Sequence, residues 1–186
     1  KDGNTQTVAS GNTWECTGVL KSATITVTLY QKMTLTYNAN GGNGNVESPY
    51  TTSVKNPTTT VAGQGELSKT GYSFTGWNTA SDGKGTSYAA NASITLTQSS
   101  TTLYAQWKII NYNITYEGVD ETFTPSRRTY TVEEGFTLTD EPSKEGYTFT
   151  GWTWTVEGGT GSSTATKTPV IAKGTTGDIV FTANWA

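Results

Sequence analysis

The sequence Gly-Tyr-Ser-Phe-Thr-Gly-Trp, at residues 71–77, returns as Gly-Tyr-Thr-Phe-Thr-Gly-Trp at residues 146–152. The two heptamers are identical at six of seven positions, and each combines three aromatic residues with two glycines. A buried aromatic side chain removes roughly 150–250 Å² from water, and glycine permits backbone conformations that other residues avoid. We therefore predict that the heptamer is the central strand of a small domain that is present twice.

The internal repeat extends on both sides of the heptamer. Upstream, the residues at 33–37 match those at 112–116, and downstream, 103–107 match 181–185. The order of these segments is the same in both copies, although the loops between them differ in length. This order predicts the domain boundaries. We expect a β-hairpin or a fragment of a preceding domain at 1–31, a first repeat at 32–108 and a second repeat at 109–186.

The composition indicates a mainly β protein, or α+β at most. Threonine and aromatic residues favour strands, and the 21 glycines fall in clusters that are typical of turns. The segment at 63–70 is the one place where a helical turn is expected, and its glycines keep that turn short. Residues 78–86, which contain Ser-Asp-Gly-Lys-Gly, are typical of an exposed loop.

The spacing of the aromatic residues in the heptamer predicts an irregular strand. Tyr72 and Phe74 share one face of an extended chain, but Trp77 lies an odd number of residues from Phe74 and would face the other way. All three can enter one core only if the strand bulges at Gly76, and the same argument applies to Gly151.

The sequence offers little catalytic or metal-binding chemistry. It has no histidine, which removes the commonest general base and metal ligand. Cys16 is the only cysteine, and the acidic pairs at 133–134 and 140–141 have no counterpart in the first copy, so a solvated surface explains them better than a glycosidase pair. We expect no catalysis, no cofactor and no metal.

The charge and hydropathy of the chain exclude two further classes. A net charge of −3 disfavours binding to nucleic acid and to anionic membranes. The chain has no run of 18 apolar residues, so we expect no insertion into a membrane.

Three residues are candidates for ligand contact. Trp154 replaces a small polar residue of the first copy and shares strand parity with Trp152, so it either fills a gap in the packing, which we favour, or forms an exposed platform for a sugar or a protein. Arg127 and Arg128 lie close to Tyr130 and could bind an anionic sugar, but the exposed end of a strand explains them equally well.

Three motifs in fixed order carry a resemblance to a known family. Tyr-Asn-Ala-Asn-Gly-Gly at 37–42, the heptamer, and Leu-Tyr-Ala-Gln-Trp at 103–107 together resemble the Listeria–Bacteroides repeat, the B-repeat type of internalin-like bacterial surface proteins. The first copy matches closely over 33–107. The second copy, over 112–185, lacks the Asn-Gly-Gly turn and has a longer glycine-rich loop after its Trp. The resemblance implies a small β-grasp-like fold with minimal helix, an extracellular location and no catalysis.

The expected function is that of a non-catalytic spacer and adhesion module from a bacterial cell-surface or secreted protein. Its partners would be a host or matrix protein or a glycan, and the segment would be monomeric within a longer multidomain chain. The alternative is a carbohydrate-binding accessory module of a larger extracellular enzyme. Saturable glycan binding that is lost in Trp154→Ala would favour the alternative.

Overall fold

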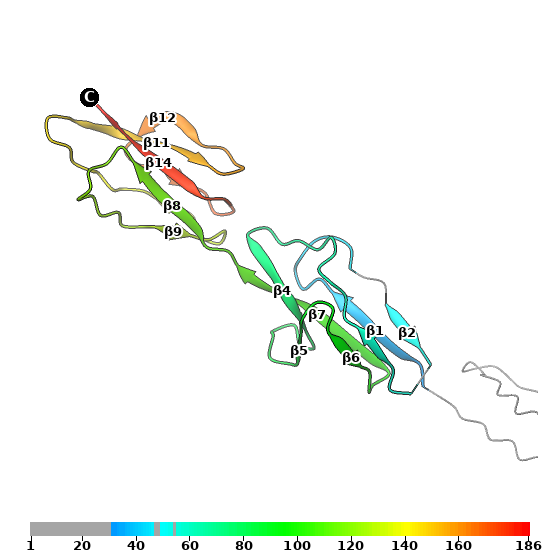
Figure 1. Cartoon of the computed structure of the whole chain (residues 1–186). Coiled ribbons are helices and arrows are strands. Elements are labelled where there is room, and N and C mark those ends of the chain that lie inside the picture. The colour runs from blue at the N-terminus through cyan, green and yellow to red at the C-terminus, as the bar shows by residue number, and fades with distance from the viewer. Residues whose placement is uncertain (1–30, 47–48, 54) are drawn as a thin grey trace, which may run out of the picture. The chain divides into compact units, whose positions relative to one another are not determined.

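The computed structural model describes residues 31–46, 49–53 and 55–186 (Figure 1). Strands, turns and irregular segments account for all of these residues and none of them is helical, which confirms the mainly β class. The predicted hairpin, apart from Gln31, and Cys16 fall outside the described residues. The chain divides into two compact units, of which the second contains Ser68–Phe74 and Trp107–Ala186, and the first contains the other described residues.

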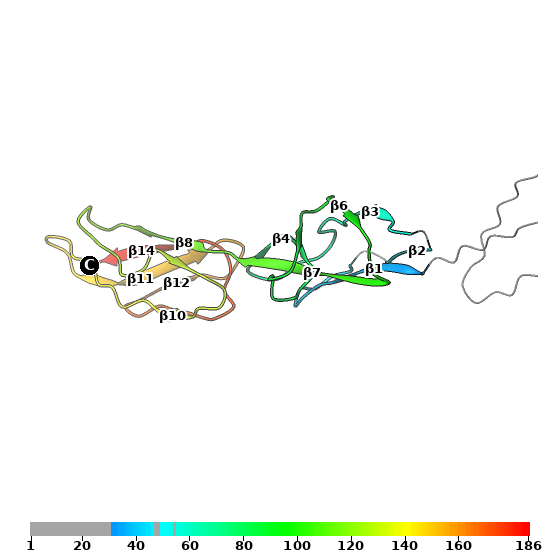
Figure 2. The ribbon, with the colours of Figure 1, turned by 90° about the horizontal axis from the view of Figure 1, so that it is seen from below.

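The first repeat forms a five-stranded mixed sheet with the order β2-β1-β7-β4-β5. β1 and β7 pair in parallel at its centre, with Thr34 opposite Ser100, while β2 and β5 pair antiparallel with β1 and β4. The strands are β1 (Met33–Asn38), β2 (Tyr50–Thr52), β4 (Tyr72–Asn78), β5 (Ser87–Tyr88) and β7 (Ser100–Ile109). A ribbon of β3 (Thr58–Thr60) and β6 (Ser93–Thr95) lies over one face of this sheet (Figure 2).

The second repeat has the same topology. Its sheet has the order β9-β8-β14-β11-β12, and β8 and β14 form the parallel central pair. The strands are β8 (Tyr112–Glu117), β9 (Thr129–Tyr130), β11 (Phe149–Val156), β12 (Ser162–Thr166) and β14 (Ile179–Trp185). A separate ribbon joins β10 (Phe136–Thr137) and β13 (Val170–Ile171). The β-grasp-like fold implied by the resemblance stays a prediction.

Each repeat buries the Trp of its heptamer in its core. Trp77 is 1% exposed and Trp152 is fully buried. Each indole donates a hydrogen bond of 2.8 Å to a backbone carbonyl, Trp77 to Ala62 and Trp152 to Asp140. The alternating strands around them supply the remaining apolar side chains, which in the second repeat include Ile114, Tyr130, Leu138, Phe149, Ile179 and Phe181.

The predicted irregularity in the heptamer strand is present. The register of β11 against β14 shifts between Phe149 and Gly151, and Gly151 has φ +140°. Gly76 has φ +130°, outside the range of an extended strand. In the second repeat Phe149 and Trp152 are buried in the core. Tyr147, the first aromatic residue of the heptamer, is 56% exposed and lies outside it.

One expectation for the loops was wrong, and another holds except at one residue. Residues 63–70 contain a turn closed by a 3.1 Å hydrogen bond from Leu67 N to Gln64 O instead of a helix, since its glycines favour a turn. The loop at 78–86 is exposed for most of its length, but Asn78 is fully buried. Its side chain makes five hydrogen bonds of 2.8–3.3 Å to Ala80, Gly83, Gly85 and Ser87, which hold the loop in place.

Candidate functional site

The acidic residues that the sequence presents in pairs have structural partners. Glu134 forms an ion pair with Arg127 at 3.1 Å, and Glu141 forms one with Lys167 at 3.5 Å. Asp140 accepts hydrogen bonds of 3.0 Å from the backbone and hydroxyl of Ser126. Among the described residues, no three His, Cys, Asp or Glu side chains come together in a group that could hold a metal ion.

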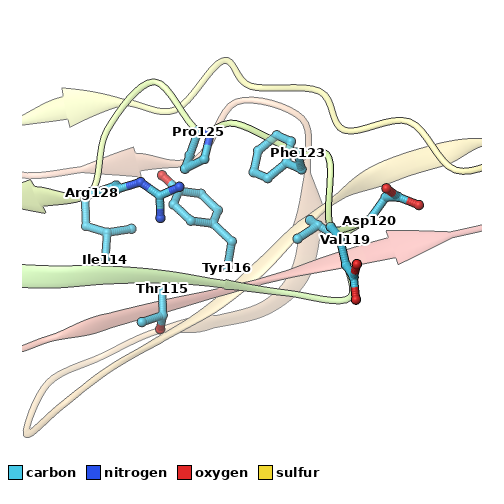
Figure 3. Close-up of a pocket in the computed structure, with 9 residues that line it drawn as sticks. Ile114, Thr115, Tyr116, Val119, Asp120, Phe123, Pro125 and Arg128 are labelled. Atoms are coloured by element: carbon cyan, nitrogen blue, oxygen red, sulfur yellow. The ribbon is translucent and has the colours of Figure 1, made fainter.

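One concave surface of the second repeat is a hollow of about 380 Å³ beside β8, which we call the aromatic hollow (Figure 3). In this view Arg128 and Phe123 lie on either side of Tyr116. The residues that line the hollow are Ile114, Thr115, Tyr116, Val119, Asp120, Glu121, Phe123, Pro125 and Arg128.

The loop after β8 forms the rim of the hollow. The chain turns at Gly118, where φ is +70°, a conformation that favours glycine. Asp120 then accepts hydrogen bonds from the backbone of Thr122 at 3.0 Å and from its hydroxyl at 2.8 Å. These bonds lower the pKa of Asp120. The same turn is closed by a 3.0 Å bond from Phe123 N to Asp120 O, which brings the Phe123 ring back toward the sheet.

Tyr116 forms the floor of the hollow. Its ring packs edge-on against Phe123 and Trp152, at centroid distances of 5.5 and 5.6 Å, and stacks on Phe181 at 5.8 Å. Its hydroxyl donates a 2.8 Å hydrogen bond to the carbonyl of Arg127. Burial raises the pKa of Tyr116 to about 12, with the charge of Asp140 adding to the effect, so the hydroxyl stays neutral at physiological pH.

The two adjacent arginines have different environments. Arg127 is held by its ion pair with Glu134 and lies over the ring of Phe136, with 4.9 Å between its Cζ and the ring centroid. Arg128 is exposed and lines the aromatic hollow. Arg128 is therefore the arginine that is available to a ligand at this hollow.

Trp154 lies at a different place on the second repeat. It is half-buried, and its ring centroid is 6.1 Å from that of Phe181, so part of the indole packs on the core. Its remaining surface borders a second hollow of about 610 Å³, lined by Thr153, Trp154, Thr155, Gly161, Ser162, Ser163, Thr182 and Asn184. Trp154 and Arg128 thus line separate hollows.

Sequence reasoning singled out Arg128 but missed the other residues that build the aromatic hollow. Tyr116 was expected only as a strand residue, and Asp120 was not singled out. The available signals were local: Phe123 is a large aromatic residue in a mostly polar segment, and Asp120 with Thr122 matches the spacing of a side-chain-capped turn.

Two of the longer curated proteins are similar to this chain. Internalin H of Listeria monocytogenes serovar 1/2a is 34% identical over 151 residues, which cover 80% of this chain and 25% of that protein. A Gly-rich protein of Evansella cellulosilytica, named as a membrane protein, is 42% identical over 100 residues, which cover 50% of this chain and 12% of that protein. The chain therefore spans a quarter or less of the length of these relatives.

No solved structure matches the chain. Among the described residues, no helix is long and apolar enough to cross a membrane. The sequence model of the Listeria-Bacteroides repeat domain matches residues 34–106 and again residues 112–184. These segments coincide with the two seven-strand frameworks described above, and the chain belongs to the Listeria–Bacteroides repeat family, of which it carries two tandem copies.

Proposed function

We propose that this chain is a non-catalytic repeat region of a bacterial cell-surface or secreted protein, in which the framework acts as a spacer and the loops provide adhesion. One observation carries the proposal: the two repeats have the same strand order but different loops. After its first strand the first repeat makes a tight turn with a 3.0 Å bond from Gly42 N to Ala39 O. In the second repeat the corresponding loop turns at Gly118 instead and forms the aromatic hollow. The similarity to Internalin H supports an extracellular location.

The aromatic hollow supports contact with a host or matrix protein. Tyrosine, phenylalanine and arginine are enriched in protein interfaces, and rigid aromatic side chains bury area at little entropic cost. Tyr116 and Phe123 are already fixed by their packing. Arg128 adds an exposed cation at the edge, where it would select a partner with an acidic side chain beside an apolar one.

The adhesion proposal is tested by measuring binding of the whole chain to immobilised extracellular-matrix proteins. We expect saturable binding to at least one of them, weakened at least tenfold by Arg128→Ala and by Phe123→Ala. Lys173→Ala is the matched control, since Lys173 is an exposed cation of the same repeat that does not line the hollow. No saturable binding, or binding that Arg128→Ala and Phe123→Ala leave unchanged, would contradict the proposal.

The second hollow favours the alternative of a carbohydrate-binding accessory module. Its lining combines the edge of Trp154 with the side chains of Ser162, Thr182 and Asn184, and an aromatic ring beside hydroxyl and amide groups suits a sugar. A glycan array decides between the two functions. Binding that is lost in Trp154→Ala but kept in Arg128→Ala would favour the carbohydrate module over the protein adhesin.

A further inference from the structure

The turn that precedes the heptamer has the same structure in both repeats. Tyr72 N donates to Lys69 O at 2.9 Å, and Tyr147 N donates to Lys144 O at 3.1 Å. The glycines before the tyrosines have φ +74° and +77°. In each turn the lysine ammonium lies over the tyrosine ring, at 4.3 Å in the first and 4.5 Å in the second. The two turns therefore present equivalent surfaces.

The first turn is in contact with other residues of the second compact unit, to which Ser68–Phe74 belongs. A Cβ atom added at Gly71 would lie 2.4 Å from Cβ of Val132, so the bare backbone of Gly71 is in contact with that side chain. Val132 is only 9% exposed, although it is not part of the hydrophobic cluster of the second repeat. The turn therefore contributes to the burial of Val132.

Two polar contacts complete this arrangement. Gly71 O accepts a 2.9 Å hydrogen bond from Ile110 N. The Tyr72 hydroxyl donates a hydrogen bond to the carboxylate of Glu133, and this bond raises the pKa of Tyr72. In the first turn, the glycine is therefore in contact with the β-branched side chain of Val132, and the tyrosine is bonded to the carboxylate of Glu133.

The second turn has no such cover among the described residues. A Cβ atom added at Gly146 would have no heavy atom within 4 Å, and Tyr147 is 56% exposed. Beside it is a hollow of about 580 Å³, bordered by Lys144, Phe149, Lys167 and Trp185. The Lys144 ammonium lies 5.9 Å from the Trp185 ring centroid as well as over Tyr147, so cationic and aromatic groups face outward together.

We propose that the surface formed by Lys144, Gly146, Tyr147 and Trp185 is a docking site for a further repeat of this same family. The incoming repeat would place a β-branched residue on Gly146 and an acid on Tyr147, as Val132 and Glu133 do at the first turn. The charges agree with this occupant, because Glu133 of an incoming repeat is an acid and the turn presents Lys144, whereas Glu134 is already paired with Arg127. This proposal is independent of the proposed adhesive function, since the docking surface includes neither the aromatic hollow nor the hollow beside Trp154.

The test extends the whole chain by a second copy of residues 108–186, joined directly after Trp185 so that the Trp-Lys-Ile-Ile spacing of 107–110 is reproduced. The appended copy carries Tyr147→Phe, so that only the original copy reports the nitration of Tyr147. Tyrosine nitration by tetranitromethane is then followed residue by residue with mass spectrometry. We expect Tyr147 to be nitrated at least fivefold more slowly in the extended chain than in the original one. The rate at Tyr72 should be the same in both chains and serves as the internal reference.

Substitutions in the appended copy identify the contact. Val132→Lys should restore the fast nitration of Tyr147, and the milder Glu133→Gln should restore part of it without risk to folding. Glu121→Gln, an exposed acid of the same copy, is the matched control and should change nothing. In the unextended chain Val132→Lys should accelerate nitration of Tyr72. Equal nitration of Tyr147 in both chain lengths, or protection that survives both Val132→Lys and Glu133→Gln, would overturn the proposal.

Discussion

Trp77 donates its indole N–H to the carbonyl oxygen of Ala62 at 2.8 Å, and only 1% of Trp77 is exposed. The same side chain therefore fills the core of the first repeat and satisfies a backbone acceptor. The two roles can be separated by substitution. Trp77→Ala removes the whole ring system, whereas Trp77→Phe keeps one aromatic ring and removes the N–H donor together with part of the volume.

We predict that Trp77→Ala lowers the free energy of unfolding of the first repeat by about 3–5 kcal/mol, because it leaves a large cavity. Trp77→Phe should cost about 1–3 kcal/mol in addition to the volume lost, since the carbonyl of Ala62 loses its donor. Chemical denaturation followed by circular dichroism measures both. A free energy of unfolding for Trp77→Ala that equals that of the parent chain would show that the indole does not support the core.

Gly151→Ala should destabilise the second repeat by more than a change at an ordinary loop glycine. Gly151 has φ +140°, and an added Cβ would lie 2.7 Å from the backbone carbon of Thr166. Gly158→Ala is the matched control, because Gly158 also has positive φ, +67°, but an added Cβ meets nothing within 4 Å. Backbone strain alone costs about 1–2 kcal/mol. Equal losses of stability in the two variants would mean that the close approach of Thr166 is unimportant.

Asn78→Ala should unfold the loop at 78–86 before the rest of the first repeat. The substitution removes the buried side chain that bonds backbone groups of Ala80, Gly83 and Gly85, at a cost of about 1–3 kcal/mol. Asp82→Ala removes an exposed side chain of the same loop and should change stability by less than about 0.5 kcal/mol. Amide hydrogen exchange of the loop reports the difference, and equal protection in both variants would contradict the role given to Asn78.

The second repeat should lose stability in alkaline solution. Burial raises the pKa of Tyr116 and of Tyr130 to about 12 in the folded chain, whereas an unfolded tyrosine titrates near 10. Because the folded pKa is the higher one, the contribution is complete below pH 10 and is lost as the pH rises from about 10 through 12. The double variant Tyr116→Phe and Tyr130→Phe should show a shallower fall over that interval in denaturation experiments. If the free energy of unfolding falls as steeply in the double variant as in the parent chain, other groups cause the loss of stability in alkaline solution.

The sequence predicts the framework well because the framework depends on local periodicity. The alternation in β1 and β14 and the odd spacing between Phe74 and Trp77 are readable without a structure, and they correspond to the buried faces and the irregular strand that are observed. The two heptamers identify the repeat because aromatic residues and glycines together are rare.

The loops were harder to predict because their structure depends on side chains that reach across many residues. Asn78 is polar and adjoins a turn sequence, so nothing local indicates that it is buried. The aromatic hollow requires Phe123 to fold back on Tyr116, and that contact follows from capping by Asp120 and not from periodicity. The different environments of Arg127 and Arg128 depend on Glu134, seven residues away from Arg127.

The parallel pairing of the first and last long strands in each repeat has a mechanical consequence. Because β1 and β7 run in the same direction, the chain enters the first repeat at one end of this pair and leaves it at the other, and β8 and β14 repeat the arrangement. A pulling force applied along the chain therefore loads the hydrogen bonds between the two strands in shear, all at once, instead of opening them one after another. Each repeat is built to resist tension along the direction of its own backbone.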